Sequence, residues 1–213
     1  MKKIVALVGD YYHQEELARE SLLKAAAAKI ASGQLQIDFA KDPAEFLAKL
    51  ENGPDAAILF AEDRIDPVDH PDARWMTTDI SDKIVQYVEG GGGWLAWHSG
   101  LASYPVDSGY VHMLRGYFLM HPDKHKPVRY TAEGSKGADS FELLDEHYFV
   151  HCEEESTEVY LRSTSVDGQS IAGWRHSYGT GRVSCLTPAH RAEGLLDVHF
   201  LQWLEHEIDW TTG

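Results

Sequence analysis

A histidine and a serine stand at the end of a short apolar segment. Residues 94–97 are apolar, four glycines precede them at 90–93, and His98, Ser99 and Gly100 follow directly. A continuous apolar run is typical of a parallel strand that is covered on both faces, and ligands bind beyond the carboxyl ends of such strands. We therefore expect His98 or Ser99 to line a crevice. The alternative is that His98 only bonds a neighbouring carbonyl group within a glycine-rich loop.

Two further histidines and a glutamate stand in comparable places. His121 and His190 each follow an apolar run, and Glu146 lies in the segment Asp-Glu-His-Tyr. A carboxylate and imidazoles that meet at one edge of a sheet can transfer protons to and from a ligand. The sequence therefore predicts His98, His190 and Glu146 as catalytic residues.

The same side chains also suggest a metal site. Neutral imidazoles and a carboxylate suit zinc or another transition metal, which makes His98, His121, His190 and Glu146 candidate ligands. Ligands on separate loops need only meet in space, so their separation along the sequence does not test this idea. Histidines at strand ends also tie loops together without binding a metal, and the sequence leaves both interpretations open.

Ser99 could imitate the nucleophile of a hydrolase if His190 and Glu193 completed a triad. A nucleophile elbow generally has glycine two residues before the serine, and this sequence has Trp97 there. Ser99 is therefore expected to form hydrogen bonds to a ligand or to cap a helix. An acid–base pair of His190 with Glu193 remains a further possibility.

The elements that must position these residues alternate between strand and helix. Apolar runs predict strands at 4–8, 35–39, 56–60, 94–97 and 182–186, and helical spacing predicts helices over 14–31, 42–50, 78–89 and 195–208. Residues 61–76 read as an acidic loop, and short runs at 128–130, 158–162 and 170–174 favour antiparallel strands. This order predicts one α/β domain over residues 1–213, with a flavodoxin-like, mostly parallel sheet flanked by helices and a small antiparallel extension.

Composition limits the partners. The formal net charge of −15 repels phosphate groups, so neither nucleic acid nor an anionic membrane is an expected partner. No apolar run approaches the roughly 20 residues that cross a bilayer, and the start does not read as a signal peptide, which favours a cytoplasmic location. Trp203 and Trp210 could pack internally or against a second subunit, so a homo-oligomer stays open.

Four motifs in this order resemble a known family. They are Gly-Gly-Gly-Trp-Leu-Ala-Trp-His-Ser at 91–99, Arg-Gly-Tyr-Phe-Leu-Met-His at 115–121, Asp-Glu-His-Tyr at 145–148 and Tyr-Gly-Thr-Gly-Arg-Val-Ser-Cys-Leu-Thr-Pro-Ala-His at 178–190. Together they look like the motifs of the ThuA-like (trehalose-utilisation) proteins, within the class I glutamine amidotransferase-like superfamily, from about residue 4 to 206. Ala189, where the family usually has glycine, and Ser184, near which it has aromatic residues, depart from this pattern.

The resemblance implies a fold without the usual nucleophile. In amidotransferases the turn at this position carries a catalytic cysteine that a histidine on a later strand activates. Here His98 matches the cysteine position and His190 matches the histidine, whereas Cys152 and Cys185 stand elsewhere. The chain is therefore not expected to be a functional glutamine amidotransferase.

The resemblance also implies a sugar as the small-molecule ligand. The leading hypothesis is a protein of carbohydrate metabolism that binds a sugar or glycoside derivative and acts on it by acid–base chemistry, with or without a divalent metal such as zinc. Ser99, His121, Tyr148 and Trp97 are the residues expected to contact it, because aromatic faces and polar groups together suit carbohydrates. The alternatives are a non-catalytic binding or assembly module on the same fold and a hydrolase that depends on Ser99.

Overall fold

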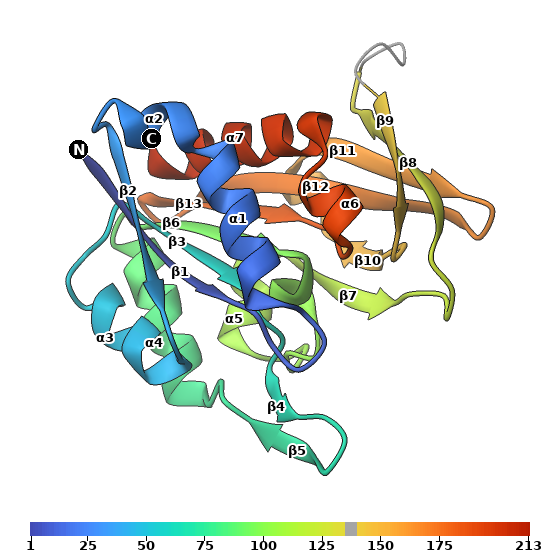
Figure 1. Ribbon diagram of the computed structural model, residues 1–213. Coiled ribbons are helices and arrows are strands. Elements are labelled where there is room, and N and C mark those ends of the chain that lie inside the picture. Colours follow the sequence, from blue (N-terminus) through green and yellow to red (C-terminus); the bar gives the residue numbers. More distant parts are fainter. Residues whose placement is uncertain (135–139) are drawn as a thin grey trace.

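The computed structural model describes residues 1–134 and 140–213, which form a mixed α/β fold around one large sheet (Figure 1). The strands of this sheet are β1 (Lys2–Val8), β2 (Leu35–Ala40), β3 (Ala56–Phe60), β6 (Gly93–Trp97), β8 (Lys126–Ala132), β9 (Ser140–Asp145), β11 (Glu158–Ser165), β12 (Gly168–Tyr178) and β13 (Gly181–Leu186). Their order across the nine-stranded sheet is β2-β1-β3-β6-β13-β12-β11-β8-β9.

The sheet changes direction at β13. The strands β2, β1, β3, β6 and β13 pair in parallel, and the remaining neighbours from β13 to β9 pair antiparallel. The predicted fold class is thus confirmed, and its antiparallel extension consists of four strands that continue the parallel part. Two smaller sheets pair β4 (Arg64–Asp66) with β5 (His70–Arg74) and β7 (Gly116–Met120) with β10 (Phe149–Cys152).

Helices cover both faces of the parallel part (Figure 1). They are α1 (Glu15–Ala25), α2 (Ala27–Ala31), α3 (Pro43–Leu50), α4 (Thr78–Glu89), α5 (Gly109–Leu114), α6 (Ala192–Leu195) and α7 (Val198–Thr212). Successive residues of β1 point to opposite faces, so Ile4 packs in the cluster beneath α1 and α7, and Val5 in the one beneath α3, α4 and α5. A strand buried on both faces explains the continuous apolar runs in the sequence.

Three predicted elements differ in detail. The helix over 14–31 is divided at Ala26, where no proline or glycine signals a break. The helix predicted over 195–208 begins instead at Val198 and ends at Thr212, and Leu195 ends the separate helix α6. The Asp197 carboxylate begins α7, because it accepts hydrogen bonds from the backbone N–H groups of His199 and Phe200. The acidic loop over 61–76 contains the hairpin of β4 and β5, whose strands are short and largely exposed.

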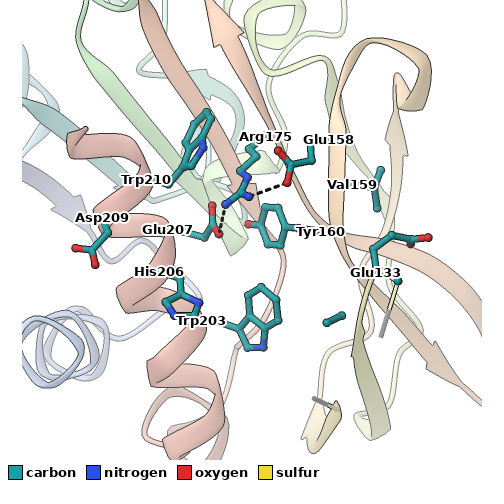
Figure 2. Close-up of a pocket in the computed structure, with 12 residues that line it drawn as sticks. Glu133, Glu158, Val159, Tyr160, Arg175, Trp203, His206, Glu207, Asp209 and Trp210 are labelled. Atoms are coloured by element: carbon teal, nitrogen blue, oxygen red, sulfur yellow. Dashed lines mark hydrogen bonds and ion pairs between the residues drawn. The ribbon is translucent and has the colours of Figure 1, made fainter. Parts of the chain in front are cut away.

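The helix α7 and the antiparallel strands enclose a cavity of about 710 Å³. Trp203 and Trp210 of α7 both line it, together with Tyr160 of β11, Arg175 of β12 and Glu207 of α7 (Figure 2). The ring of Trp203 stacks on Tyr160 with centroids 5.7 Å apart. The guanidinium group of Arg175 lies over the ring of Trp210, 5.4 Å from its centroid, so both tryptophans have contacts within the chain. Among the described residues, no helix is both long and apolar enough to cross a membrane.

Candidate functional site

The turn after β6 places His98 at the carboxyl edge of the parallel strands. His98 has a φ of 48°, in the left-handed region that side chains seldom adopt, so the chain reverses sharply at this residue. Gly100 makes the turn possible, because a Cβ atom there would lie 2.2 Å from the carbonyl oxygen of Leu59. The predicted turn is therefore present, and it carries an imidazole at the carboxyl end of β6.

The two ring nitrogens of His98 have different surroundings. Nδ1 lies 2.6 Å from the carbonyl oxygen of Thr187, which can only accept, so Nδ1 carries the hydrogen. Nε2 then faces the Nδ1 of His190 at 3.3 Å and the Oε2 of Glu146 at 3.6 Å. The carbonyl contact that the sequence offered as an alternative exists, and it orients the other nitrogen toward two of the predicted residues.

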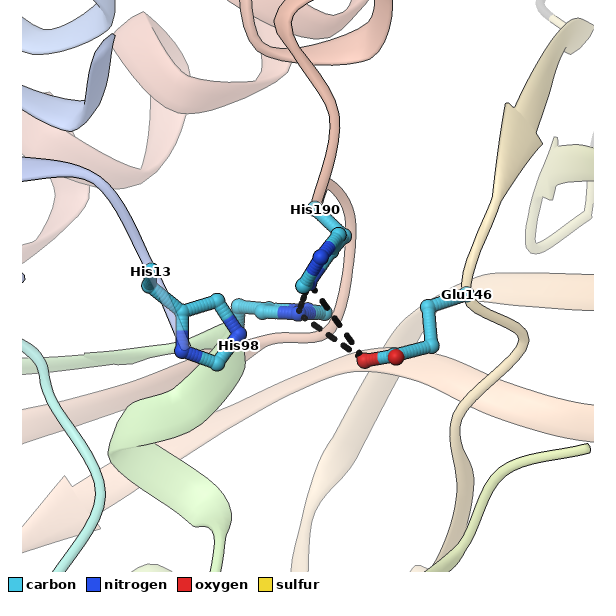
Figure 3. Close-up of side chains that lie close together, drawn as sticks. All are labelled: His13, His98, Glu146 and His190. Atoms are coloured by element: carbon cyan, nitrogen blue, oxygen red, sulfur yellow. Dashed lines mark hydrogen bonds and ion pairs between the residues drawn. The ribbon is translucent and has the colours of Figure 1, made fainter. Parts of the chain in front are cut away.

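Four side chains form what we call the His–Glu group: His13, His98, Glu146 and His190 (Figure 3). Each contributes one nitrogen or oxygen atom, and these atoms all lie within 4.8 Å of one another. The four residues follow the strands β1, β6, β9 and β13. The structure thus brings together the three predicted catalytic residues and adds a fourth.

His13 was missed by the sequence analysis. The Nδ1 of its ring lies 2.6 Å from the carboxylate of Asp10, which also accepts hydrogen bonds from the backbone N–H groups of Tyr12 and Glu62. Asp10 lies two residues after the end of β1, and these contacts fix the loop that carries His13. The available signal was the pair Gly9-Asp10 at a strand end, three residues before a histidine.

Two more histidines approach the other oxygen of Glu146. The Nδ1 of His121 and the Nε2 of His125 lie 3.6 Å and 3.7 Å from its Oε1 atom. Both histidines are more exposed than His98, which is fully buried. His121 therefore lies beside the site as predicted, but outside the His–Glu group, and His125 was not predicted.

His13, Glu146 and His190 line a cavity of about 440 Å³, which we call the histidine cavity, whereas His98 is fully buried and is not among the described residues that line it. Tyr148 forms part of its wall, and its ring stacks on that of His98 with centroids 4.1 Å apart and an interplanar angle of 22°. Phe118 packs against Tyr148 with centroids 4.4 Å apart. On other walls are Glu62 and Ser103, whose hydroxyl group donates to the Oε2 of Glu62. The cavity combines aromatic faces with polar groups.

Burial and charge act against each other within the group. Burial favours the neutral form of His98, but the facing Glu146 carboxylate outweighs it, so the pKa of His98 is raised. Burial also opposes ionisation of Glu146, yet the facing histidines, His98 foremost, lower its pKa to about 2. Burial and then the charge of His98 lower the pKa of His190 to about 4. The group therefore favours a cation at His98, an anion at Glu146 and a neutral imidazole at His190.

Comparison with known proteins identifies the family. A sequence model of the ThuA family, described as trehalose utilisation, matches residues 4–211. The chain belongs to the ThuA family. No curated protein matches the sequence significantly.

Solved structures agree with the ThuA family. A ThuA-like protein from Parabacteroides merdae has a TM-score of 0.71 at 10% identity, over 99% of this chain and 90% of that one. Another from Bacteroides uniformis has a TM-score of 0.66 at 18% identity, over 99% and 91%. A β-galactosidase from Bacillus circulans has a TM-score of 0.62 at 11% identity, and this chain covers only 30% of it. At such identities the likeness shows the fold.

Two of the residues that were predicted to contact a ligand, Trp97 and Ser99, lie in the interior of this ThuA-family protein. Trp97 is fully buried in the core, and its indole N–H donates to the carbonyl oxygen of Pro188 at 2.6 Å. Ser99 is also fully buried, with an Oγ atom that has no hydrogen-bond partner within the described part of the chain. Trp97 is covered because β6 lies between β3 and β13 inside the sheet, and Ser99 is buried in the turn that follows β6. His13 and Phe118, which the sequence analysis did not predict, line the cavity instead.

The triad and the cysteine chemistry find no support in the geometry. Glu193 is largely exposed and pairs with Arg191, so it does not complete a pair with His190. Cys185 is fully buried within β13, and Cys152 lies on β10; among the described residues neither lines the histidine cavity. Burial raises the pKa of both thiols, to about 11 for Cys152.

Proposed function

We propose that the protein binds a sugar or glycoside derivative in the histidine cavity and acts on it by proton transfer through Glu146 and His190. The family is described as trehalose utilisation, and the proposal assigns this role to one cavity of the chain. The observation that carries it is the position of Glu146, whose two carboxylate oxygens are approached by four imidazole nitrogens at 3.5–3.7 Å at the wall of the cavity.

The cavity suits a small polar ligand with apolar faces. Its volume of about 440 Å³ falls within the range of roughly 300–1,000 Å³ that is common for small-molecule sites. Tyr148 and Phe118 offer apolar surface for the C–H face of a sugar ring. Glu62 offers an acceptor, because its Oε1 atom lacks a hydrogen-bond partner among the described residues. Sugar hydroxyl groups would satisfy such acceptors.

The proposed chemistry needs no covalent intermediate. An imidazole and a carboxylate that line a cavity can remove and return a proton at a ligand atom within hydrogen-bond reach. The two thiols and the Ser99 hydroxyl have no part in the proposed reaction, because none of them belongs to the described residues that line the cavity. The proposal therefore favours proton transfer over hydrolysis through Ser99 or a cysteine.

Deuterium exchange tests the proposal. Trehalose, glucose and other mono- and disaccharides would be screened by saturation-transfer NMR, and exchange of their C–H hydrogens would be followed in D₂O. We expect at least one sugar to bind and to exchange. Glu146→Gln should retain binding and slow the exchange about 100-fold or more. The matched control is Glu193→Gln, at an exposed glutamate outside the cavity, which should leave both unchanged.

Three outcomes would decide between the hypotheses. Binding without exchange would favour the non-catalytic binding module, and exchange unaffected by Glu146→Gln would place the chemistry elsewhere. If none of the sugars bound, the sugar proposal would be wrong. A cytoplasmic location and a homo-oligomer are further parts of the proposal, which cell fractionation and light scattering would test.

A further inference from the structure

We propose that the His–Glu group binds one divalent transition-metal ion such as zinc. The imidazoles of His13, His98 and His190 would hold the ion, and the Oε2 atom of Glu146 would close its fourth position. This set retains His98, His190 and Glu146 from the candidates that the sequence offered and replaces His121 with His13. The role of the ion in the reaction rests on the proposed function. Binding of the ion does not, because it can be measured without any sugar.

The first observation is the buried nitrogen of His13. The residue is 9% exposed, and its Nε2 atom has no hydrogen-bond partner among the described residues. A buried polar atom without a partner destabilises the folded chain. One ring nitrogen of His13 lies within 4.8 Å of a nitrogen or oxygen atom of each of the other three residues, and Nε2 is the nitrogen that Asp10 leaves without a partner. A metal ion between them would satisfy it.

The second observation is the spacing of the facing atoms. The Nε2 of His98, the Nδ1 of His190 and the Oε2 of Glu146 form a triangle with sides of 3.3, 3.5 and 3.6 Å. Zinc bonds of about 2.0–2.1 Å at tetrahedral angles separate neighbouring ligand atoms by roughly 3.4 Å. Most N–H···O hydrogen bonds are shorter, at about 2.7–3.2 Å. The triangle thus matches one face of a coordination tetrahedron.

The third observation is how the imidazoles are oriented. His13 and His98 each direct Nδ1 to an oxygen acceptor at 2.6 Å, the carboxylate of Asp10 and the carbonyl of Thr187. Metal-bound histidines almost always donate their other N–H to such a group, which fixes the ring and the tautomer. The loop of His190 is also held, because its backbone N–H donates to Asp145 at 2.8 Å.

His121 fits this centre less well. Its Nδ1 faces the other oxygen of Glu146, and its side chain is 38% exposed. It therefore lies at the cavity side of Glu146. A metal ion in the His–Glu group would polarise a ligand oxygen or lower the pKa of a bound hydroxyl group. Glu146 would hold the ion through Oε2, while its Oε1 atom faces His121 and His125 at 3.6 Å and 3.7 Å.

Metal titration tests the inference. Full-length protein would be stripped with EDTA and titrated with ZnCl₂ in a calorimeter, and its zinc content would be measured after dialysis. We expect one ion per chain. His13→Ala should weaken zinc binding at least about 100-fold, whereas His121→Ala and the exposed His70→Ala should change it less than about threefold. Zinc binding that is unchanged in His13→Ala would overturn the proposed ligand set.

Two measurements keep the test informative if His13→Ala does not fold. X-ray absorption of the zinc-loaded wild-type protein should show three imidazole ligands and one oxygen, and Co²⁺ should give the absorption bands of a tetrahedral ion. A wild-type chain that retained no stoichiometric metal, or a spectrum with fewer than three imidazoles, would refute the inference. Sugar binding by the EDTA-stripped protein would in that case leave the proposed function standing.

Discussion

Replacing Glu207 with glutamine should change how the stability of the protein depends on pH. Glu207 is fully buried beside the cavity that α7 lines (Figure 2). The Ser184 hydroxyl donates a hydrogen bond to its Oε2 atom at 2.7 Å. Burial raises its pKa to about 7, although the Ser184 hydroxyl and the charge of Arg175 oppose this rise. The folded chain therefore holds a proton on Glu207 at pH values where the unfolded chain has released it.

The sign and size of the effect follow from this rise. A raised pKa contributes stability that is fully present below the unfolded value of 4.5 and is lost as the pH rises through the folded value of about 7. The difference between the two values corresponds to about 3 kcal/mol. Glutamine has the same shape and does not ionise. The free energy of unfolding of wild type minus that of Glu207→Gln should fall by about 3 kcal/mol between about pH 4.5 and 8.

Equilibrium unfolding in guanidinium chloride at several pH values measures this difference. The matched control is Glu158→Gln, because Glu158 pairs with the same arginine, Arg175, but is 62% exposed. Its effect should stay below about 1 kcal/mol at every pH. A constant difference between wild type and Glu207→Gln would refute the reasoning. It would mean that Arg175 stabilises the ionised carboxylate enough to offset burial.

Two other predictions concern the turn after β6 and the thiols. Gly100→Ala should lower the free energy of unfolding by about 3 kcal/mol, since the added Cβ would meet the carbonyl oxygen of Leu59; a denaturant midpoint close to that of wild type would contradict the described turn. A chromogenic disulfide reagent should label Cys152 slowly and Cys185 only after unfolding, because burial raises the pKa of both thiols. Rapid labelling of the native chain would reopen a cysteine-based reaction.

Much of the fold could be predicted because its parallel strands are buried on both faces. The runs at 56–60 and 94–97 are continuous and apolar, and they are the strands β3 and β6. Helix ends were less predictable, because the break at Ala26 has no local signal. The hairpin of β4 and β5 was missed for a related reason: its strands lie outside the core and have no apolar pattern.

Strand ends predicted part of the site. His98, Glu146 and His190 were predicted because each follows an apolar run or stands in a recognisable motif, and the structure brings them within reach of one another. His13 belongs to no such motif, and its role depends on the contact with Asp10. Trp97 was predicted to contact the ligand because aromatic faces suit carbohydrates, but its indole is buried and donates to the carbonyl oxygen of Pro188.

The origin of the His–Glu group in four separate segments bears on how the protein folds. Its members span residues 13 to 190 of a chain of 213, so no short fragment contains them all. Contacts between residues so distant in sequence require long loops to close, which makes them slow to form. The complete group can exist only after β13 has joined the sheet beside β6. The rate at which the refolding chain binds a metal ion would then report when β13 pairs with β6 and completes the sheet.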